Sequence, residues 1–300
     1  METSKIIIVP KMSKYEWDLH RYNLTHEQLI KKYAQDNIDA DRILKSHDRQ
    51  KESLNSLQKY FHNFQFVSRE NFTRETARNA DIIIALGGDN HLQYVSHFID
   101  STLLMGVNSD TARSEGALTY FTAEDFEKIL LKIEKDDFDI EEWQRLECIL
   151  NGTSISLTTS EYFLGENARK FMSRHILKIG DKEEEQKGSG LLVSTGAGST
   201  GWYDSECRYL YPDGNIFPKT SKYARFLNTA PYRGKLNGYS MLEGKLEEGM
   251  ELTVYSLNDS KGIVTSDSIE DYDFNIGAKA VIKLSKKPLN ILKINRGKNE

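Results

Sequence analysis

Five residues that follow a strongly apolar run could take part in phosphate chemistry. The run spans Ile82 to Leu86, and the residues after it are Gly87, Gly88, Asp89, Asn90 and His91. Two glycines let a backbone approach a phosphate closely, and the first amides of a following helix attract an anion. A carboxylate beside such a site can orient a hydroxyl group and accept its proton, which makes Asp89 the candidate base. The sequence Gly-Gly-Asp-Asn is also an ordinary tight turn, so this motif is weak by itself.

A second segment, Ser194 to Trp202, reads Ser-Thr-Gly-Ala-Gly-Ser-Thr-Gly-Trp. Its glycines and hydroxyl side chains predict a loop that surrounds a ligand with backbone amides and short donors. Trp202 could stack on a purine, or it could be a partly buried aromatic residue at an interface. The segment lacks the lysine of the P-loop and does not match the dinucleotide-binding pattern GxGxxG, so both of those motifs are excluded.

The elements that must position the first segment alternate between strand and helix. Apolar runs at 6–9, 82–86 and 103–107 predict buried strands of a parallel sheet, and the third ends at Asn108-Ser109-Asp110. Helical spacing of apolar residues occurs at 52–61 and 92–99. Thr122 and Asp125 form a predicted capping box for a helix over 126–133. The first half therefore reads as an α/β domain, residues 1–139.

From residue 140 onward the pattern changes to short strands between turns. Candidate strands lie at 154–157, 162–164, 191–194, 251–257 and 278–284. The acidic cluster Asp181 to Glu185 lies between two of the candidate strands and is interpreted as a solvated hairpin loop. The second half is thus predicted to be a β-rich domain, residues 140–300.

Composition narrows the classes of function. The 300 residues carry a net charge of −5 with no dense lysine and arginine stretch, which argues against nucleic-acid binding. There is no signal-like start and no apolar run near the roughly 20 residues of a membrane helix, so we expect a cytoplasmic protein without membrane contact. The two cysteines, Cys148 and Cys207, show no pairing or zinc pattern and are expected to be buried free thiols.

The order of these segments resembles the NAD kinase family. Sequences of that family pair a Gly-Gly-Asp-Gly loop with a distant Thr-Pro-Thr-Gly-Ser-Thr-Ala-Tyr loop, and an Asn-Glu pair lies between them. Here Gly87-Gly88-Asp89 matches the first loop, Ser160-Glu161 falls at the pair, and Ser194 to Trp202 matches the second loop. The stretch from Gly116 to Glu147 looks like the segment that joins the two domains in the family. The resemblance covers most of the chain.

The resemblance implies an enzyme that phosphorylates the adenosine ribose 2′-hydroxyl of NAD to give NADP, with NAD bound between an α/β domain and a β-rich domain. ATP or polyphosphate would be the donor, and Mg²⁺ is expected from the chemistry without a protein metal site. By the same resemblance Asp89 would be the base, Glu161 would bind ribose hydroxyls, and adenine and ribose would contact Ala197, Gly198, Thr200 and Trp202. Further candidate nucleotide-binding residues are Gly87, Gly88, Asn90, His91, Ser160, Ser189 and Thr195. The family also implies a homo-oligomer, a dimer or a tetramer.

Several positions depart from the family pattern. Asn90 and His91 replace a glycine and a threonine or serine, so a side chain projects where bare backbone normally faces phosphate. Ser160 replaces the asparagine of the pair, and Ser189 stands where many members have an aspartate. Trp202 replaces a tyrosine, which preserves the aromatic ring. His91 is equally compatible with a phosphate contact and with a solvent-facing helix start.

Two alternatives remain open at this point. Lipid kinases of the diacylglycerol and sphingosine type also carry Gly-Gly-Asp-Gly, although the Ser160-Glu161 pair argues against them. A non-catalytic protein that binds NAD or another nucleotide could keep the fold while Asn90 and Ser160 remove turnover. Basic residues that could neutralise phosphates, or could simply be surface residues, are Arg113, Arg169, Lys170 and Arg174. The choice between NAD and NADH as acceptor is also open.

Overall fold

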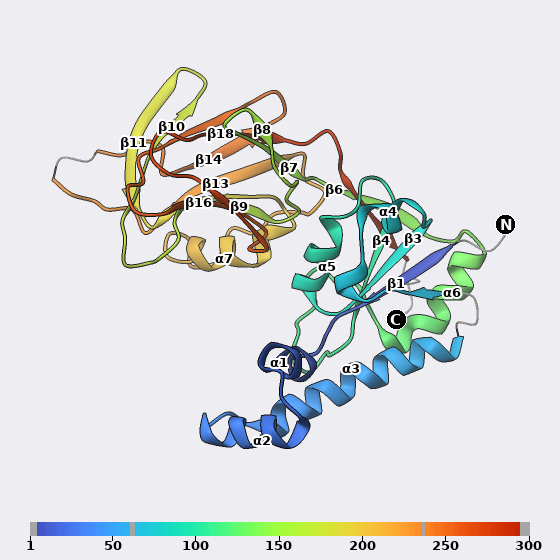
Figure 1. Cartoon of the computed structure of the whole chain (residues 1–300). Helices are drawn as coiled ribbons and strands as arrows, with labels where there is room; N and C mark the ends of the chain where they lie inside the picture. Colours follow the sequence, from blue (N-terminus) through green and yellow to red (C-terminus); the bar gives the residue numbers. More distant parts are fainter. Residues whose placement is uncertain (1–4, 61–63, 236–237, 295–300) are drawn as a thin grey trace. The chain divides into compact units, whose positions relative to one another are not determined.

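The chain folds into two compact units, described in a computed structural model over residues 5–60, 64–235 and 238–294 (Figure 1). Unit 1 comprises Met1–Glu141 together with Asn290–Glu300, and unit 2 comprises Glu142–Leu289. The predicted division at residue 140 assigned everything beyond it to the second domain. The structure differs at the carboxyl end, where β19 (Leu289–Lys293) pairs in parallel with β4 (Leu103–Asn108) of unit 1.

Unit 1 is built on a mixed, mostly parallel sheet in the order β2-β1-β3-β4-β19-β6, with β5 paired to β4. Its other strands are β1 (Ile6–Pro10), β2 (Gln65–Phe66), β3 (Ile82–Leu86), β5 (Phe121–Thr122) and β6 (Asp139–Trp143). The predicted apolar runs are these central strands, and β1 and β3 are almost wholly buried. Their isoleucines pack with α6 (Phe126–Glu134), so the α/β prediction for this half is confirmed.

The register of the central strands brings their carboxyl ends to one edge of the sheet. Pro10 lies opposite Leu86, and Leu86 lies opposite Val107. The segments that follow β1, β3 and β4 therefore emerge side by side. Helix α5 (Asp89–Ser96) starts directly after β3, and α4 (Arg74–Arg78) precedes that strand. Short 3₁₀ turns complete the unit at Arg69–Asn71 and Ala123–Asp125.

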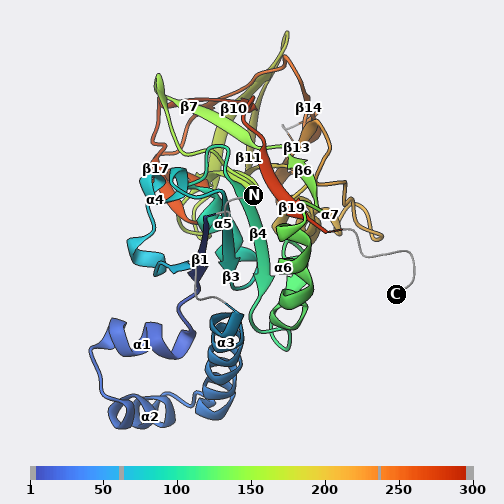
Figure 2. The same cartoon turned by 90° about the vertical axis from the view of Figure 1, so that its right-hand side faces the viewer.

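Three helices between β1 and β2 form a group of their own in unit 1 (Figure 2). They are α1 (Lys14–Tyr22), α2 (His26–Gln35) and α3 (Ala40–Tyr60). Capping boxes begin the first two helices, and a small cluster of Leu29, Tyr33 and Ile43 joins the group. The sequence predicted only residues 52–61 of this region as helix; α3 begins twelve residues earlier, and residue 61 lies outside the described residues.

Unit 2 consists of two antiparallel sheets that share one core. The first sheet has the order β11-β10-β15-β18-β7-β8, and the second has the order β14-β13-β12-β9-β16-β17. Leucines of both sheets, such as Leu177 and Leu191, belong to the same buried cluster. The bounds are β7 (Leu146–Leu150), β8 (Thr153–Ser154), β9 (Glu161–Glu166), β10 (Ser173–Ile179), β11 (Lys182–Gly188), β12 (Gly190–Ser194), β13 (Tyr223–Thr229), β14 (Glu243–Glu247), β15 (Leu252–Ser256), β16 (Gly262–Ser266), β17 (Glu270–Asp273) and β18 (Lys279–Leu284). The β-rich prediction is confirmed.

Two local predictions in unit 2 need correction. The acidic cluster Asp181 to Glu185 was predicted as a loop, but Lys182 to Gly188 is strand β11, and only the turn at Gly180 and Asp181 precedes it. An edge strand with one face in water accommodates charged side chains, so acidity did not exclude a strand. Of the predicted strand at 154–157, only Ser154 lies in a strand, β8, which begins at Thr153. Across the described residues, no helix combines the length and the apolar character that crossing a lipid bilayer requires.

Candidate functional site

The Gly87-Gly88 junction is tightly packed: Gly87 has no room for a side chain, and one on Gly88 would require the Ser114 hydroxyl to move. A Cβ atom on Gly87 would lie 2.7 Å from the Cβ of His91, and one on Gly88 would lie 2.7 Å from the hydroxyl oxygen of Ser114. Gly88 is the N-cap of α5, so Asp89 and Asn90 occupy its first turn. The first amides of a helix have no intrahelical acceptor, and they leave this end of α5 suited to an anion.

Both carboxylate oxygens of Asp89 already accept hydrogen bonds from the backbone. The amide of Ala117 donates to one oxygen at 2.9 Å, and the amide of Leu118 donates to the other at 2.8 Å. These bonds tie the start of α5 to the segment that leads to β5. A carboxylate oxygen has more than one lone pair, so each can still accept a further donor. The Asp89 carboxylate is therefore fixed in orientation and partly exposed.

His91 is buried rather than solvent-facing. Its Nε2 donates to the carbonyl oxygen of Val9 at 2.8 Å, and its ring lies against Gly87. Burial lowers the pKa of His91 to about 4, and the nearby cations Arg69 and Lys11 act in the same direction. The ring is therefore neutral at pH 7 and offers no positive charge to a phosphate.

A cavity of about 560 Å³ opens where the carboxyl ends of β1, β3 and β4 meet. Its basic lining residues are Lys11, Lys14 and Arg113, and Asp89 and Asn90 lie on the same wall. The pKa of Lys11 is lowered because its surroundings desolvate the ammonium group and Arg69 repels it. Lys14 is already paired with Asp18, whereas Arg113 and Arg69 repel the charge of Lys11, and an anionic ligand would relieve that repulsion.

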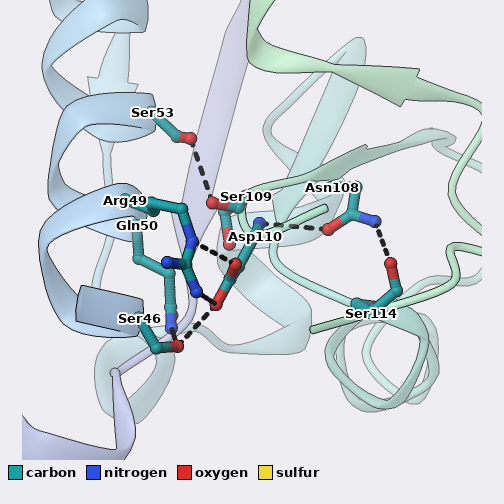
Figure 3. A network of polar contacts seen from close by, with 8 residues as sticks. All are labelled: Ser46, Arg49, Gln50, Ser53, Asn108, Ser109, Asp110 and Ser114. Carbon is teal, nitrogen blue, oxygen red and sulfur yellow. Dashed lines mark hydrogen bonds and ion pairs between the residues drawn. The ribbon is translucent and has the colours of Figure 1, made fainter. Parts of the chain in front are cut away.

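Helix α3 holds one wall of this cavity through Asp110 (Figure 3). Asp110 accepts from the Nε of Arg49 at 2.7 Å and from the hydroxyl of Ser46 at 2.5 Å. Asn108 accepts from the Asp110 amide, and its own side-chain amide donates to the carbonyl of Ser114. Although burial alone would raise the pKa of Asp110, Arg49 and Ser46 hold it below its usual range. The loop after β4 is thus fixed by charge-assisted contacts from a helix remote in sequence.

In unit 2 the Ser160-Glu161 pair and the second glycine-rich segment lie together, held mainly by Thr195. The Thr195 amide donates to the carbonyl of Ser160 at 2.8 Å, and its hydroxyl donates to the carbonyl of Thr159 at 2.6 Å. The same hydroxyl oxygen accepts from the amides of Ala197 and Gly198. Thr195 is fully buried, so its role here is to join two segments 36 residues apart.

Glycines in the second segment allow backbone to touch backbone. A Cβ on Gly196 would lie 1.9 Å from the carbonyl oxygen of Pro218, and one on Gly198 would lie 2.4 Å from the carbonyl oxygen of Ser160. The segment continues as a 3₁₀ turn, Gly198–Thr200, and then as α7 (Trp202–Cys207). Thr200 is exposed, whereas Ala197 is buried. The loop is therefore rigid, with few of its predicted ligand-binding groups facing water.

The Glu161 carboxyl group of unit 2 combines burial with the lack of a hydrogen-bond partner among the described residues. Its side chain is 8% exposed, and within the parts of the chain that the structure describes no hydrogen bond reaches its carboxyl oxygens. Burial raises the pKa of Glu161, and the neighbouring charge of Asp267 raises it further. A carboxyl group left without a partner in a buried position is expensive unless a ligand supplies one.

Trp202 stacks on Phe163, with ring centroids 4.8 Å apart, and donates its indole N–H to Glu206. It also lines a cavity of about 740 Å³ that includes Ser189 and Arg169. One face of the indole is thus occupied by protein. The structure brings Trp202 and Ser189 to one cavity, and it brings Thr195 into contact with the Thr159–Ser160 backbone, next to Glu161, among residues that do not line that cavity.

Sequence reasoning missed several residues that shape these sites. Lys11 and Lys14 line the unit 1 cavity but stand as isolated lysines in the sequence. Asp110 was noted only as the end of a strand, and nothing local identifies Arg49 as its partner. Asp267 carries no motif, and it follows an antiparallel strand, where an aspartate reads as an ordinary hairpin-turn residue.

The comparisons with known proteins agree on one family. The chain is 26% identical over 251 residues to "NAD kinase 2, mitochondrial" of Rattus norvegicus and of Homo sapiens, in each case covering 66% of this chain. It spans 59% and 57% of the lengths of those two relatives. "NAD kinase 1" of Bacillus cereus is 27% identical over 169 residues, which cover 53% of this chain and 60% of that protein. No protein-family model matches the sequence.

A solved structure extends the likeness over nearly the whole chain. The crystal structure of an NAD kinase from Archaeoglobus fulgidus in complex with ATP matches with a TM-score of 0.66 and 19% identity, over 97% of this chain and 94% of that one. At that identity the likeness shows the fold, with its mostly parallel α/β sheet followed by two antiparallel sheets.

Proposed function

Because this chain belongs to the NAD kinase family, we propose that it transfers a phosphoryl group to the 2′-hydroxyl of the adenosine ribose of NAD, giving NADP. The observation that carries the proposal is the Asp89 carboxylate. It is fixed by two backbone amides at the rim of a cavity that also presents Lys11, Lys14 and Arg113. A base beside a cationic pocket is what transfer from an anionic donor to a hydroxyl group requires.

The unit 1 cavity is assigned to the phosphates of the donor. Lys11, Lys14 and Arg113 offset the negative charge of a triphosphate, and the free amides at the start of α5 can bond its oxygens. Asn90 is exposed at the same wall and can add a side-chain donor. The neutral ring of His91 adds no charge to this site. Together with Gly87 and Gly88, it sets how closely a phosphate can approach the backbone.

In the proposed reaction the 2′-oxygen of NAD attacks the terminal phosphorus of ATP. A new oxygen–phosphorus bond forms, the bond from that phosphorus to the bridging oxygen breaks, and ADP leaves with the electron pair. The hydroxyl proton passes to the Asp89 carboxylate, whose oxygens are held in place by Ala117 and Leu118. Glu161 would accept from ribose hydroxyls, and the Ser160, Thr195, Ala197 and Gly198 turn would support it.

In the proposed reaction Mg²⁺ enters with the donor, bound to its phosphate oxygens. No group of three or more His, Cys, Asp or Glu side chains among the described residues could hold a metal ion. The carboxylates nearest the cavity are engaged, Asp89 by amides and Asp110 by Arg49. Mg²⁺ held by phosphate oxygens and water would neutralise charge on the transferred group when MgATP binds.

The test is NADP formation by the purified protein with ATP, Mg²⁺ and NAD, compared with an Asp89→Asn variant. We expect turnover to fall by about 100-fold or more, because the amide cannot accept the proton. Asp81→Asn is the matched control, since Asp81 is exposed at the start of the same strand and should leave turnover unchanged. Equal NADP formation by the Asp89→Asn variant and the parent would show that Asp89 is not the base.

A second candidate function follows from the same contacts. Because both oxygens of Asp89 hold backbone amides, the residue could serve structure alone, in a protein that binds NAD without turnover. Calorimetry that detects NAD binding, with no NADP formed from ATP or polyphosphate, would favour this alternative. Phosphorylation of a diacylglycerol or sphingoid base with none of NAD would instead favour a lipid kinase.

A further inference from the structure

Asp267 lies directly after β16 and holds the turn that leads into Glu161. Its Oδ1 accepts from the amides of Ser160 at 2.7 Å and Glu161 at 3.1 Å, and from the hydroxyl of Thr158. Its Oδ2 accepts from the amide of Thr159 at 2.9 Å. The Asp267 amide in turn donates to the carbonyl of Glu161 at 3.0 Å. One carboxylate therefore fixes four consecutive residues.

Asp267 begins the tight turn that joins β16 to β17. Asp267 has a φ of 51° and Ser268 has a φ of 55°, both in the left-handed region, and the amide of Ile269 donates to the carbonyl of Ser266 at 2.9 Å. Two left-handed residues inside such a hydrogen bond form the primed turn that hairpins favour, and aspartate tolerates this conformation. Asp267 is 4% exposed, so its carboxylate is buried among the donors of the Thr158–Glu161 segment. The hairpin turn thus fixes where this carboxylate lies.

The same carboxylate is the charge that acts on Glu161. Across the sheet, Glu161 pairs with Ser194 of β12, and the next residue, Tyr162, pairs with Ser266 of β16. The serines carry no charge, and burial raises the pKa of Tyr162 so that it stays neutral. Asp267 is the charged group that raises the pKa of Glu161, in addition to burial. Two acidic groups in one buried place oppose each other's ionisation.

We propose that Asp267 is the positioning residue of the ribose site, fixing the Thr158–Glu161 turn so that the unpartnered Glu161 carboxyl is presented to a ribose hydroxyl. This inference rests on the proposed binding of NAD, and it does not require turnover. It adds a role for Asp267 that no motif of the sequence indicates. Asp267 does not touch the substrate in this proposal; it acts through the turn and through its charge.

A consequence of the shared charge is that NAD binding should release a proton. In the free protein the raised pKa of Glu161 keeps part of the population protonated at neutral pH. A ribose hydroxyl that donates to Glu161 favours the carboxylate form, so protonated molecules lose their proton when NAD binds. Removing the charge of Asp267 lowers the pKa of Glu161, so fewer protons should be released when NAD binds.

The experiment is calorimetry of NAD binding at about pH 7 in buffers of different ionisation enthalpy, which yields the number of protons released. We expect measurable release from the parent, none from Glu161→Gln, and clearly less from Asp267→Asn. Asp267→Asn should also bind NAD about tenfold more weakly, because a charged acceptor of several amides is lost. Asp273→Asn, on the exposed part of the same hairpin, is the matched control and should match the parent.

A second variant separates position from charge and guards against a folding defect. Thr158→Val removes one donor to Asp267 and keeps the charge, so proton release should stay at the parental value while NAD binding weakens. The proposal is overturned if Asp267→Asn releases as many protons as the parent, or if Thr158→Val binds NAD with unchanged affinity. NAD binding with these shifts but without NADP formation would refute the proposed kinase activity and leave the role of Asp267 standing.

Discussion

The two carboxyl groups assigned to the reaction differ in what surrounds them. Asp89 is partly exposed and accepts a backbone amide on each oxygen, whereas Glu161 is nearly buried and accepts no hydrogen bond from the described protein groups. The carboxyl group of Asp89 is therefore held in one orientation. Glu161 is held without a partner, which makes it the group whose state should depend on a ligand. The proposed base, Asp89, belongs to unit 1, and the proposed ribose-binding group, Glu161, belongs to unit 2.

The segments that lie beside these two groups are also stabilised in different ways. The loop after β4, beside Asp89, is held by side chains, above all by the Arg49–Asp110 pair from α3. The segment beside Glu161 is held by backbone contacts, with Gly196 against Pro218 and Gly198 against Ser160. Charge-assisted contacts respond to pH and to loss of a partner, while close backbone contacts respond to added volume. Substitutions of each kind should therefore affect only one of the loops strongly.

The largest effect is expected from Gly196→Ala. The added methyl group would lie 1.9 Å from the carbonyl oxygen of Pro218, and backbone cannot yield as a flexible side chain does. We expect a loss of about 3 kcal/mol in the free energy of unfolding, measured by urea denaturation. Gly238→Ala is the control, because nothing lies within 4 Å of its Cβ position. A stability loss below about 1 kcal/mol would show that the segment is looser than its contacts indicate.

A smaller effect is expected from Arg49→Met, which removes the cation beside Asp110 and keeps much of the packing of the side chain. Asp110 is nearly buried but Arg49 is 36% exposed, so the free energy of unfolding should fall by about 1 to 2 kcal/mol at neutral pH. Arg42→Met, on the exposed first turn of the same helix, should cost little. The KM for ATP should rise, because the loop that carries Arg113 into the cavity loses its anchor.

The pH dependence of that loss gives a sharper test. The pKa of Asp110 is lowered in the folded protein, so its ion pair stabilises the fold above the unfolded pKa of about 4. The contribution is lost as the pH falls through the lower folded value. The difference between parent and Arg49→Met should therefore shrink below about pH 4. A difference that stays constant down to about pH 2 would mean that Arg49 contributes packing and not charge.

Local sequence signals predicted the central strands of unit 1 well. The apolar runs that became β1, β3 and β4 are buried on both faces, and the glycine pair that follows β3 keeps its prediction as a phosphate-binding segment. Long-range pairings could not be predicted, because they leave no pattern in the local sequence. Asp110 meets Arg49 across 61 residues and Asp267 meets the Glu161 amide across 106, and neither pair has a local pattern. The return of β19 to unit 1 is equally non-local.

The smallest expected effect concerns Asn90, which stands where the family has a glycine. Its side chain is exposed at the cavity wall, so a hydrogen bond that it makes to a phosphate competes with water. Asn90→Ala should weaken ATP binding about threefold by calorimetry, with stability unchanged within about 0.5 kcal/mol. Asn90→Asp should weaken it further, because a negative charge faces the donor phosphates. If Asn90→Asp binds ATP as tightly as the parent, the donor phosphates do not lie at the start of α5, and the assignment of that cavity to the donor fails.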